Sequence, residues 1–156
     1  MIRLFKRLVS MPSPRFAFWS QAELVDLAPL LSEVFEVENF LRDYEDTWEW
    51  LEAASKQGFR VNISRTHDQR KGDYHLPVVI SLNWGGRPLG YNESVLWITK
   101  VADRLNVEIS AGTMVDGKSP DGYDFRVDEI IVKKKESEPS AAKPTPGNPV
   151  PFRGSP

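Results

Sequence analysis

Two groups of side chains in this sequence have types and spacings that could carry chemistry. The first is a polar cluster of His67, Asp68, Asp73 and His75. Seven residues separate the two histidines across a predicted hairpin turn, so their imidazoles could approach each other. Zinc needs three or four converging ligands, so Glu45 or Asp46 would have to complete such a site. The cluster leaves open a metal-assisted hydrolase that uses His67, His75 and a nearby carboxylate, although a solvated polar turn explains the same residues.

The second group is an acidic and aromatic string, Tyr44-Glu45-Asp46-Thr47-Trp48-Glu49-Trp50. Paired carboxylates can act as general acid and base, but the sequence shows neither a partner carboxylate at a defined distance nor a cleft. Tryptophan is enriched at binding hot spots, although a packed core aromatic is the common alternative. We therefore predict no catalytic residues and a surface that binds a protein partner. Its predicted residues are Asp43, Tyr44, Glu45, Asp46, Glu49 and Trp50.

Other catalytic classes lack a recognisable signal. The chain has no cysteine, which excludes disulfides, thiolate metal sites and cysteine nucleophiles. It contains no G-x-S-x-G elbow and no glycine-rich phosphate loop of the G-x-x-x-x-G-K or G-x-G-x-x-G type. The sequence therefore predicts no cofactor and favours a non-enzyme without deciding the question.

The charge of the chain is distributed unevenly. The formal net charge of −2 combines +4 in residues 1–18, −8 in residues 19–58 and +2 in residues 59–75. Such a balance argues against a protein that coats nucleic acid. Residues 19–58 are instead expected to steer a basic protein partner, although solvated helix surfaces would show the same charges. A toxin-neutralising, immunity-type role fits this size and acidity.

Composition divides the chain into three parts. Residues 1–18 are predicted to be a basic, loosely ordered arm, residues 19–135 a single domain, and residues 136–156 a disordered tail that holds six of the 12 prolines. The longest uncharged run has 11 residues, too few to span a membrane. We therefore expect a cytoplasmic protein. A targeting role for the arm, a docking role for the tail and a dimeric state stay open.

Hydrophobic periodicity predicts the elements that must position these side chains. Helices are predicted from a capping box at Ser20 and Glu23 to Val34, over residues 46–57, and over residues 92–105. Strands are predicted over residues 35–38, 59–64, 76–84, 107–115 and 123–132.

The order of these elements predicts the fold. Residues 34–115 give β-α-β-β-α-β, the order of the α+β ferredoxin-like plait, here with an extra N-terminal helix and a C-terminal strand. Another arrangement of the same elements is the alternative. Helices on one face of the sheet would leave the other face polar, without a stacking aromatic, which argues against RNA binding. Its predicted residues are Arg60, Asn62, Ser64, Ser81, Asn83, Glu108 and Ser110.

Overall fold

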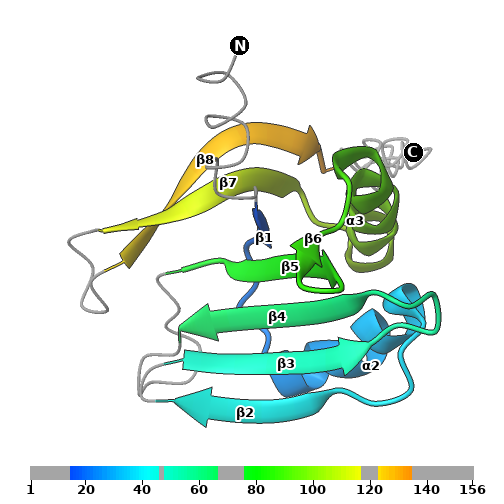
Figure 1. The fold of residues 1–156 in the computed structure, drawn as a ribbon. Coiled ribbons are helices and arrows are strands. Elements are labelled where there is room, and N and C mark those ends of the chain that lie inside the picture. Colours follow the sequence, from blue (N-terminus) through cyan, green and yellow to red (C-terminus); the bar gives the residue numbers. More distant parts are fainter. Residues whose placement is uncertain (1–14, 46–47, 67–75, 117–122, 135–156) are drawn as a thin grey trace, which may run out of the picture.

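The computed structural model describes residues 15–45, 48–66, 76–116 and 123–134, which form an antiparallel sheet of eight strands and two helices (Figure 1). In chain order the elements are β1 (Arg15–Phe18), α2 (Leu24–Phe35), β2 (Leu41–Glu45), β3 (Trp48–Ala54), β4 (Arg60–Thr66), β5 (Val78–Trp84), β6 (Arg87–Pro88), α3 (Tyr91–Leu105), β7 (Ile109–Asp116) and β8 (Tyr123–Val132). Neither helix is long and apolar enough to cross a membrane.

The sheet order is β2-β3-β4-β5-β1-β7-β8, with β6 paired to β5 outside this path. The prediction of an α+β ferredoxin-like plait is therefore wrong. A plait places one helix inside each β-α-β half, whereas here the strands β2, β3, β4 and β5 follow one another between the two helices. Strand β1, from the segment assigned to the N-terminal arm, lies between β5 and β7, where Phe16 is opposite both Ile80 and Ala111.

The predicted helix over residues 46–57 is also wrong, because its described part is mainly strand β3. Leu51 and Ala53 face the core and Trp50 faces away, which is the alternation of a strand. In the strand, Trp48 and Ala54 lie on the face opposite Leu51, so their helical spacing does not correspond to one buried stripe. Aromatic residues also favour strands, where they pack against cross-strand neighbours.

Two details of the first helix differ from prediction. Glu23 occupies the N-cap position of α2, and Ser20 Oγ instead accepts a hydrogen bond from the amide of Ala22 at 3.1 Å, so no capping box forms. The helix passes through Pro29 and ends at Phe35. The strand predicted over residues 35–38 is reduced to an isolated bridge between Val37 and Ser55.

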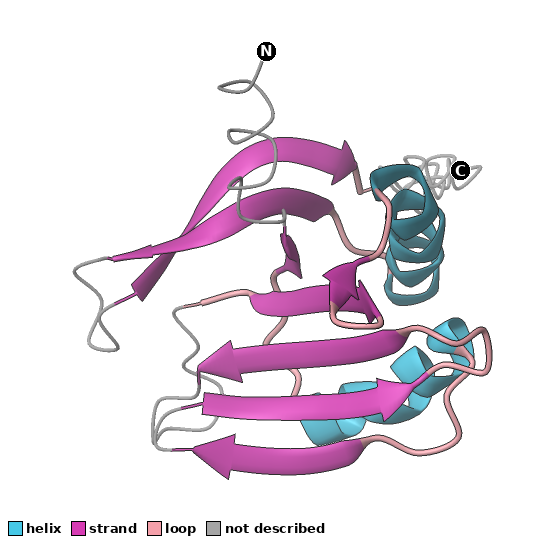
Figure 2. Cartoon of the chain, in the orientation of Figure 1, coloured by secondary structure: helices cyan, strands magenta, loops and turns pink. Residues whose placement is uncertain are grey.

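The remaining predicted elements within the described residues are confirmed to within a few positions: the strands near β4, β5, β7 and β8, and the helix near α3. Both helices share one core with a single face of the sheet, and α2 lies behind β2, β3 and β4 (Figure 2). Three aromatic rings join these layers, with centroids 6.3 Å apart for Phe35 and Trp97, 6.5 Å for Phe35 and Phe59, and 5.0 Å for Phe59 and Trp97.

Strands β7 and β8 form a hairpin that arches away from the rest of the sheet (Figure 1). Two register shifts, between Ile109 and Ser110 and between Ala111 and Gly112, mark β-bulges, which increase local twist. A Cβ atom at Gly112 would overlap the carbonyl oxygen of Arg126 and lie 2.8 Å from the ring of Phe125. The absence of a side chain at Gly112 therefore lets Phe125 fold back over β7.

Candidate functional site

Strand alternation divides the predicted binding surface between the two faces of the sheet. Asp43 and Trp50 are cross-strand neighbours, as are Tyr44 and Glu49 one position along the β2–β3 hairpin. Tyr44 and Glu49 point to the face that carries the helices. Asp43 and Trp50 point to the opposite face, which no helix among the described residues covers and which we call the helix-free face.

Glu49 is a buried group with an ionic partner. Its side chain is 2% exposed, and its Oε1 atom lies 2.6 Å from Nε of Arg42. Burial lowers the pKa of Arg42, but the hydrogen bond to Glu49 and the charge of Glu49 outweigh this effect, so the pKa of Arg42 is raised. The Arg42 guanidinium also lies 4.5 Å from the ring centroid of Tyr44.

Arg65 is directly opposite Glu49 on the neighbouring strand and is equally buried. It donates hydrogen bonds to the carbonyl oxygens of Ser20 at 2.9 Å and Ala22 at 2.6 Å. These bonds hold the segment before α2 against the sheet. Glu49 and Arg65 therefore serve the fold, and the Glu49 carboxylate is not accessible to a partner.

The remaining predicted residues are only partly brought together. Asp43 is exposed, Tyr44 is exposed on the helix-bearing side, and Trp50 is half-buried. Glu45 ends strand β2, and Asp46 lies outside the described residues. The structure thus keeps Asp43 and Trp50 as neighbours on one accessible face and separates Tyr44 and Glu49 from them.

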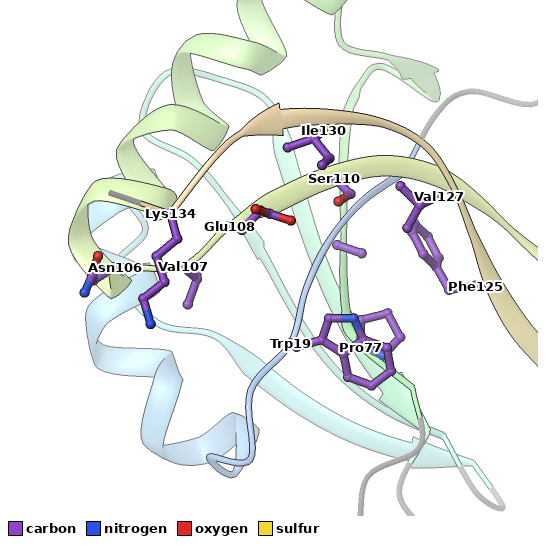
Figure 3. A pocket seen from close by; sticks show the side chains of 11 residues that line it. Trp19, Pro77, Asn106, Val107, Glu108, Ser110, Phe125, Val127, Ile130 and Lys134 are labelled. Atoms are coloured by element: carbon purple, nitrogen blue, oxygen red, sulfur yellow. The ribbon is translucent and has the colours of Figure 1, made fainter. Parts of the chain in front are cut away.

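A pocket of about 350 Å³ lies on the helix-free face between β1, β7 and β8 (Figure 3). Trp19 and Phe125 form two of its walls, and Val127 and Ile130 contribute further apolar surface. The full set of lining residues is Ala17, Trp19, Pro77, Asn106, Val107, Glu108, Ser110, Phe125, Val127, Ile130 and Lys134.

Several apolar side chains in the walls of this pocket are exposed to solvent. Trp19 is 59% exposed, Val127 51% and Ile130 46%, and these three belong to the nine large apolar residues exposed in the described part of the chain. Exposed apolar side chains gathered at one place mark an interaction site more often than scattered ones do. Sequence reasoning missed the pocket because its residues come from distant segments; the alternation of Phe125 and Val127 beside polar neighbours was the available signal.

Polar residues of β4 and β5 share this face, as predicted. Asn62, Ser64, Ser81 and Asn83 are half-buried there, in contrast to the buried Val61 and Ile63 on the helix-bearing side. Trp48 and Trp50, which the sequence placed on a helix, join the same face. The helix-free face is therefore both polar and aromatic, and the prediction that the open face lacks an aromatic side chain is wrong.

The alternative metal site lies outside the described residues, since His67 and His75 are not among them. Within the residues that the structure does describe, no group of three or more histidine, aspartate or glutamate side chains could hold a metal ion.

No protein-family model matches this chain, and no match was found among curated proteins or solved structures.

Proposed function

We propose that this protein is a non-enzymatic module that binds a basic segment of a partner protein on its helix-free face. The neutralisation of a basic toxin would be one form of this function. The observation that carries the proposal is the exposed apolar wall of the pocket formed by Trp19, Val127 and Ile130.

The pocket supports a macromolecular partner because it can receive one large apolar side chain as an anchor. Buried aromatic and aliphatic anchors supply most of the binding energy of protein interfaces. Trp19 is well suited to contact such an anchor, since it exposes more than half of its surface beside the half-buried ring of Phe125.

The acids of the same face support a partner with positive charge. Asp43 lies beside Trp50 on the β2–β3 hairpin, and Glu108 lies in the pocket wall. Neither carboxylate forms an ion pair with another described residue, whereas Glu52 on this face is paired with Arg60 at 2.9 Å. Acids with no ion pair among the described residues steer and orient a basic segment more than they add affinity.

The experiment is affinity capture from the source cells with the full-length chain, followed by kinetic binding measurements on the purified partner. The test variants are the double reversal Asp43→Lys with Glu108→Lys, and Trp19→Ala. The charge-matched control is Asp26→Lys with Glu93→Lys, at exposed positions on the two helices.

A basic partner is expected, and the double reversal should slow association at low salt by about tenfold or more. Trp19→Ala should instead speed dissociation, because it removes contact area, and the helix control should change neither rate. A partner of acidic charge, or equal effects of the helix control and the face variants, would overturn the proposal.

A further inference from the structure

The sheet has two edge strands, β2 and β8, and they are not equally suited to pairing with a further strand. At β2, the amide of Tyr44 already donates a hydrogen bond to Oδ1 of Asp43 at 2.8 Å, so this amide is occupied. At the edge strand β8, the described residues pair with it on one side only, through β7. Its first five residues, Tyr123–Val127, pair with Gly112–Asp116 without a register shift.

The bulges limit which part of β8 is suited to pairing. A register shift falls after Val127, where Asp128 is the extra residue, and a second shift follows Glu129 and Ile130. Bulges bend a strand and interrupt its ladder, which protects an edge from unwanted pairing. The regular stretch of free edge is therefore Tyr123–Val127.

This stretch is complementary to itself when it is read in the opposite direction. An antiparallel pairing centred on Phe125 places Phe125 opposite Phe125 of a second copy. The same pairing places Asp124 opposite Arg126 of the second copy, and the two-fold axis repeats that contact. Directly opposite residues in antiparallel strands lie about 4.5–5.5 Å apart, so each pair is within ionic reach.

The side chains that would meet are available. Asp124 is exposed and forms no ion pair with another described residue. The Arg126 side chain is 62% exposed; it contacts Asp128 at 3.2 Å and Thr113 at 3.1 Å through different nitrogens. A guanidinium has five N–H donors, so Arg126 can keep these contacts and bind a second carboxylate.

We propose that two copies of this protein associate through antiparallel pairing of their β8 strands around Phe125, with reciprocal contacts between Asp124 and Arg126. This inference stands independently of the proposed function. The pairing joins two sheets into one and sets the two helix-free faces, with their pockets, on the same side. Because only five residues pair on each side, the interface is small and the dimer is reversible and concentration-dependent.

The test is sedimentation equilibrium of the full-length chain over a wide concentration range. Arg126→Asp converts both attractive contacts into repulsive ones and should weaken dimerisation by about tenfold or more. The exchange variant, Asp124→Arg with Arg126→Asp, restores opposite charges at both positions and should recover most of the wild-type affinity. Arg87→Asp, an exposed reversal on β6, is the matched control and should leave the dimer unchanged.

Circular dichroism of each variant establishes that the monomer folds. Should Arg126→Asp fail to fold, Asp124→Arg creates the same double repulsion while keeping the contacts of Arg126 with Asp128 and Thr113. A wild-type chain that stays monomeric at all concentrations would overturn the proposal. The proposal would also be overturned if neither single reversal changed the dimerisation affinity. The same holds if the exchange variant dimerised as weakly as the single reversals.

Discussion

Glu49 is a buried carboxylate on β3, and Arg42 of the neighbouring strand lies beside it. A carboxylate removed from water is costly unless ionic and hydrogen-bonding partners compensate it. Arg42 supplies such a partner at 2.6 Å, and the buried Arg65 stands opposite on β4. The position that the sequence suggested for partner binding thus links β3 to β2, while Arg65 holds the segment before α2.

Replacement of Arg42 by Ala should therefore lower the free energy of unfolding. The expected loss is about 3 kcal/mol, near the lower end for a broken buried pair because Arg42 itself is partly exposed. Arg60→Ala removes the exposed pair with Glu52 one strand away and should cost less than about 1 kcal/mol. Urea denaturation measures both, and equal losses would contradict a special role for Glu49.

Tyr91 provides a prediction about pH. The pKa of Tyr91 is raised, first by burial and then by the charge of Glu129. The hydrogen bond from the Tyr91 hydroxyl to Oε2 of Glu129, at 3.3 Å, acts in the same direction. A raised pKa means that the folded state favours the neutral phenol over the phenolate. Its contribution to stability is therefore complete below the ordinary tyrosine pKa of about 10 and is lost as the pH rises through the folded-state value.

Glu129→Gln should bring the pKa of Tyr91 closer to its ordinary value. Ultraviolet absorbance titration can follow this change, with Tyr91→Phe identifying which part of the tyrosine signal belongs to this residue. An unchanged titration in Glu129→Gln would show that the carboxylate does not act on the phenol.

At the scale of elements, both helices end in the same way. Glu36 after α2 and Asn106 after α3 adopt left-handed conformations, with φ of 53° and 52°. The amide at each cap returns to a helix carbonyl, Ser32 in α2 and Ala102 in α3. Asparagine tolerates this conformation, but glutamate pays a steric penalty in it.

Glu36→Gly should therefore stabilise the protein by about 0.5–1 kcal/mol, since glycine adopts positive φ freely. Asn106→Gly is the matched comparison at the equivalent position and should have a smaller effect. Thermal unfolding would show the difference as a higher melting temperature for Glu36→Gly. A lower melting temperature would mean that the exposed hydrogen bond from Gln57 to Glu36 outweighs the backbone strain.

The arched β7–β8 hairpin depends on Gly112 in a different way. A serine there would meet the carbonyl of Arg126 and the ring of Phe125, so β8 would have to move. We expect Gly112→Ser to destabilise the protein by about 1–3 kcal/mol, as overpacking does. Gly90→Ser is the control, because a Cβ at Gly90 meets nothing within 4 Å and serine is a favourable N-cap. Chemical denaturation compares the two.

At the scale of the whole molecule, the aromatic cluster couples the two helices through one core. Phe35 belongs to α2 and Trp97 to α3. Phe59, the residue before β4, contacts both of these rings. Loss of any one of these rings removes contacts from both helices at once. The described residues should therefore unfold together.

Phe59→Ala should lower the free energy of unfolding by about 3–5 kcal/mol, the usual cost of removing a buried aromatic ring. Tryptophan fluorescence and far-ultraviolet circular dichroism should report coincident transitions before and after the substitution. Separate transitions would show that α3 and the β2–β3 end of the sheet unfold independently.

Several elements could be predicted because their signals are local. The alternation around Val61 and Ile63 and the helical stripe of Val95, Ile98 and Ala102 each report one element's own period. The prediction for Trp48 to Ala54 was wrong because this strand carries apolar residues on both faces and a buried charged residue, Glu49, so its sequence shows no clear alternation.

The sequence by itself determined the strong local periods, the absence of cysteine chemistry and the acidity of residues 19–58. Only the tertiary structure decided that β1 enters the sheet between β5 and β7, that Asp43 and Glu49 face opposite sides, and that Trp19 meets Phe125 around a pocket. The physical reason is that a shift of one residue in a strand reverses every side chain. Pairing between distant segments, moreover, is selected by the packing of the whole core.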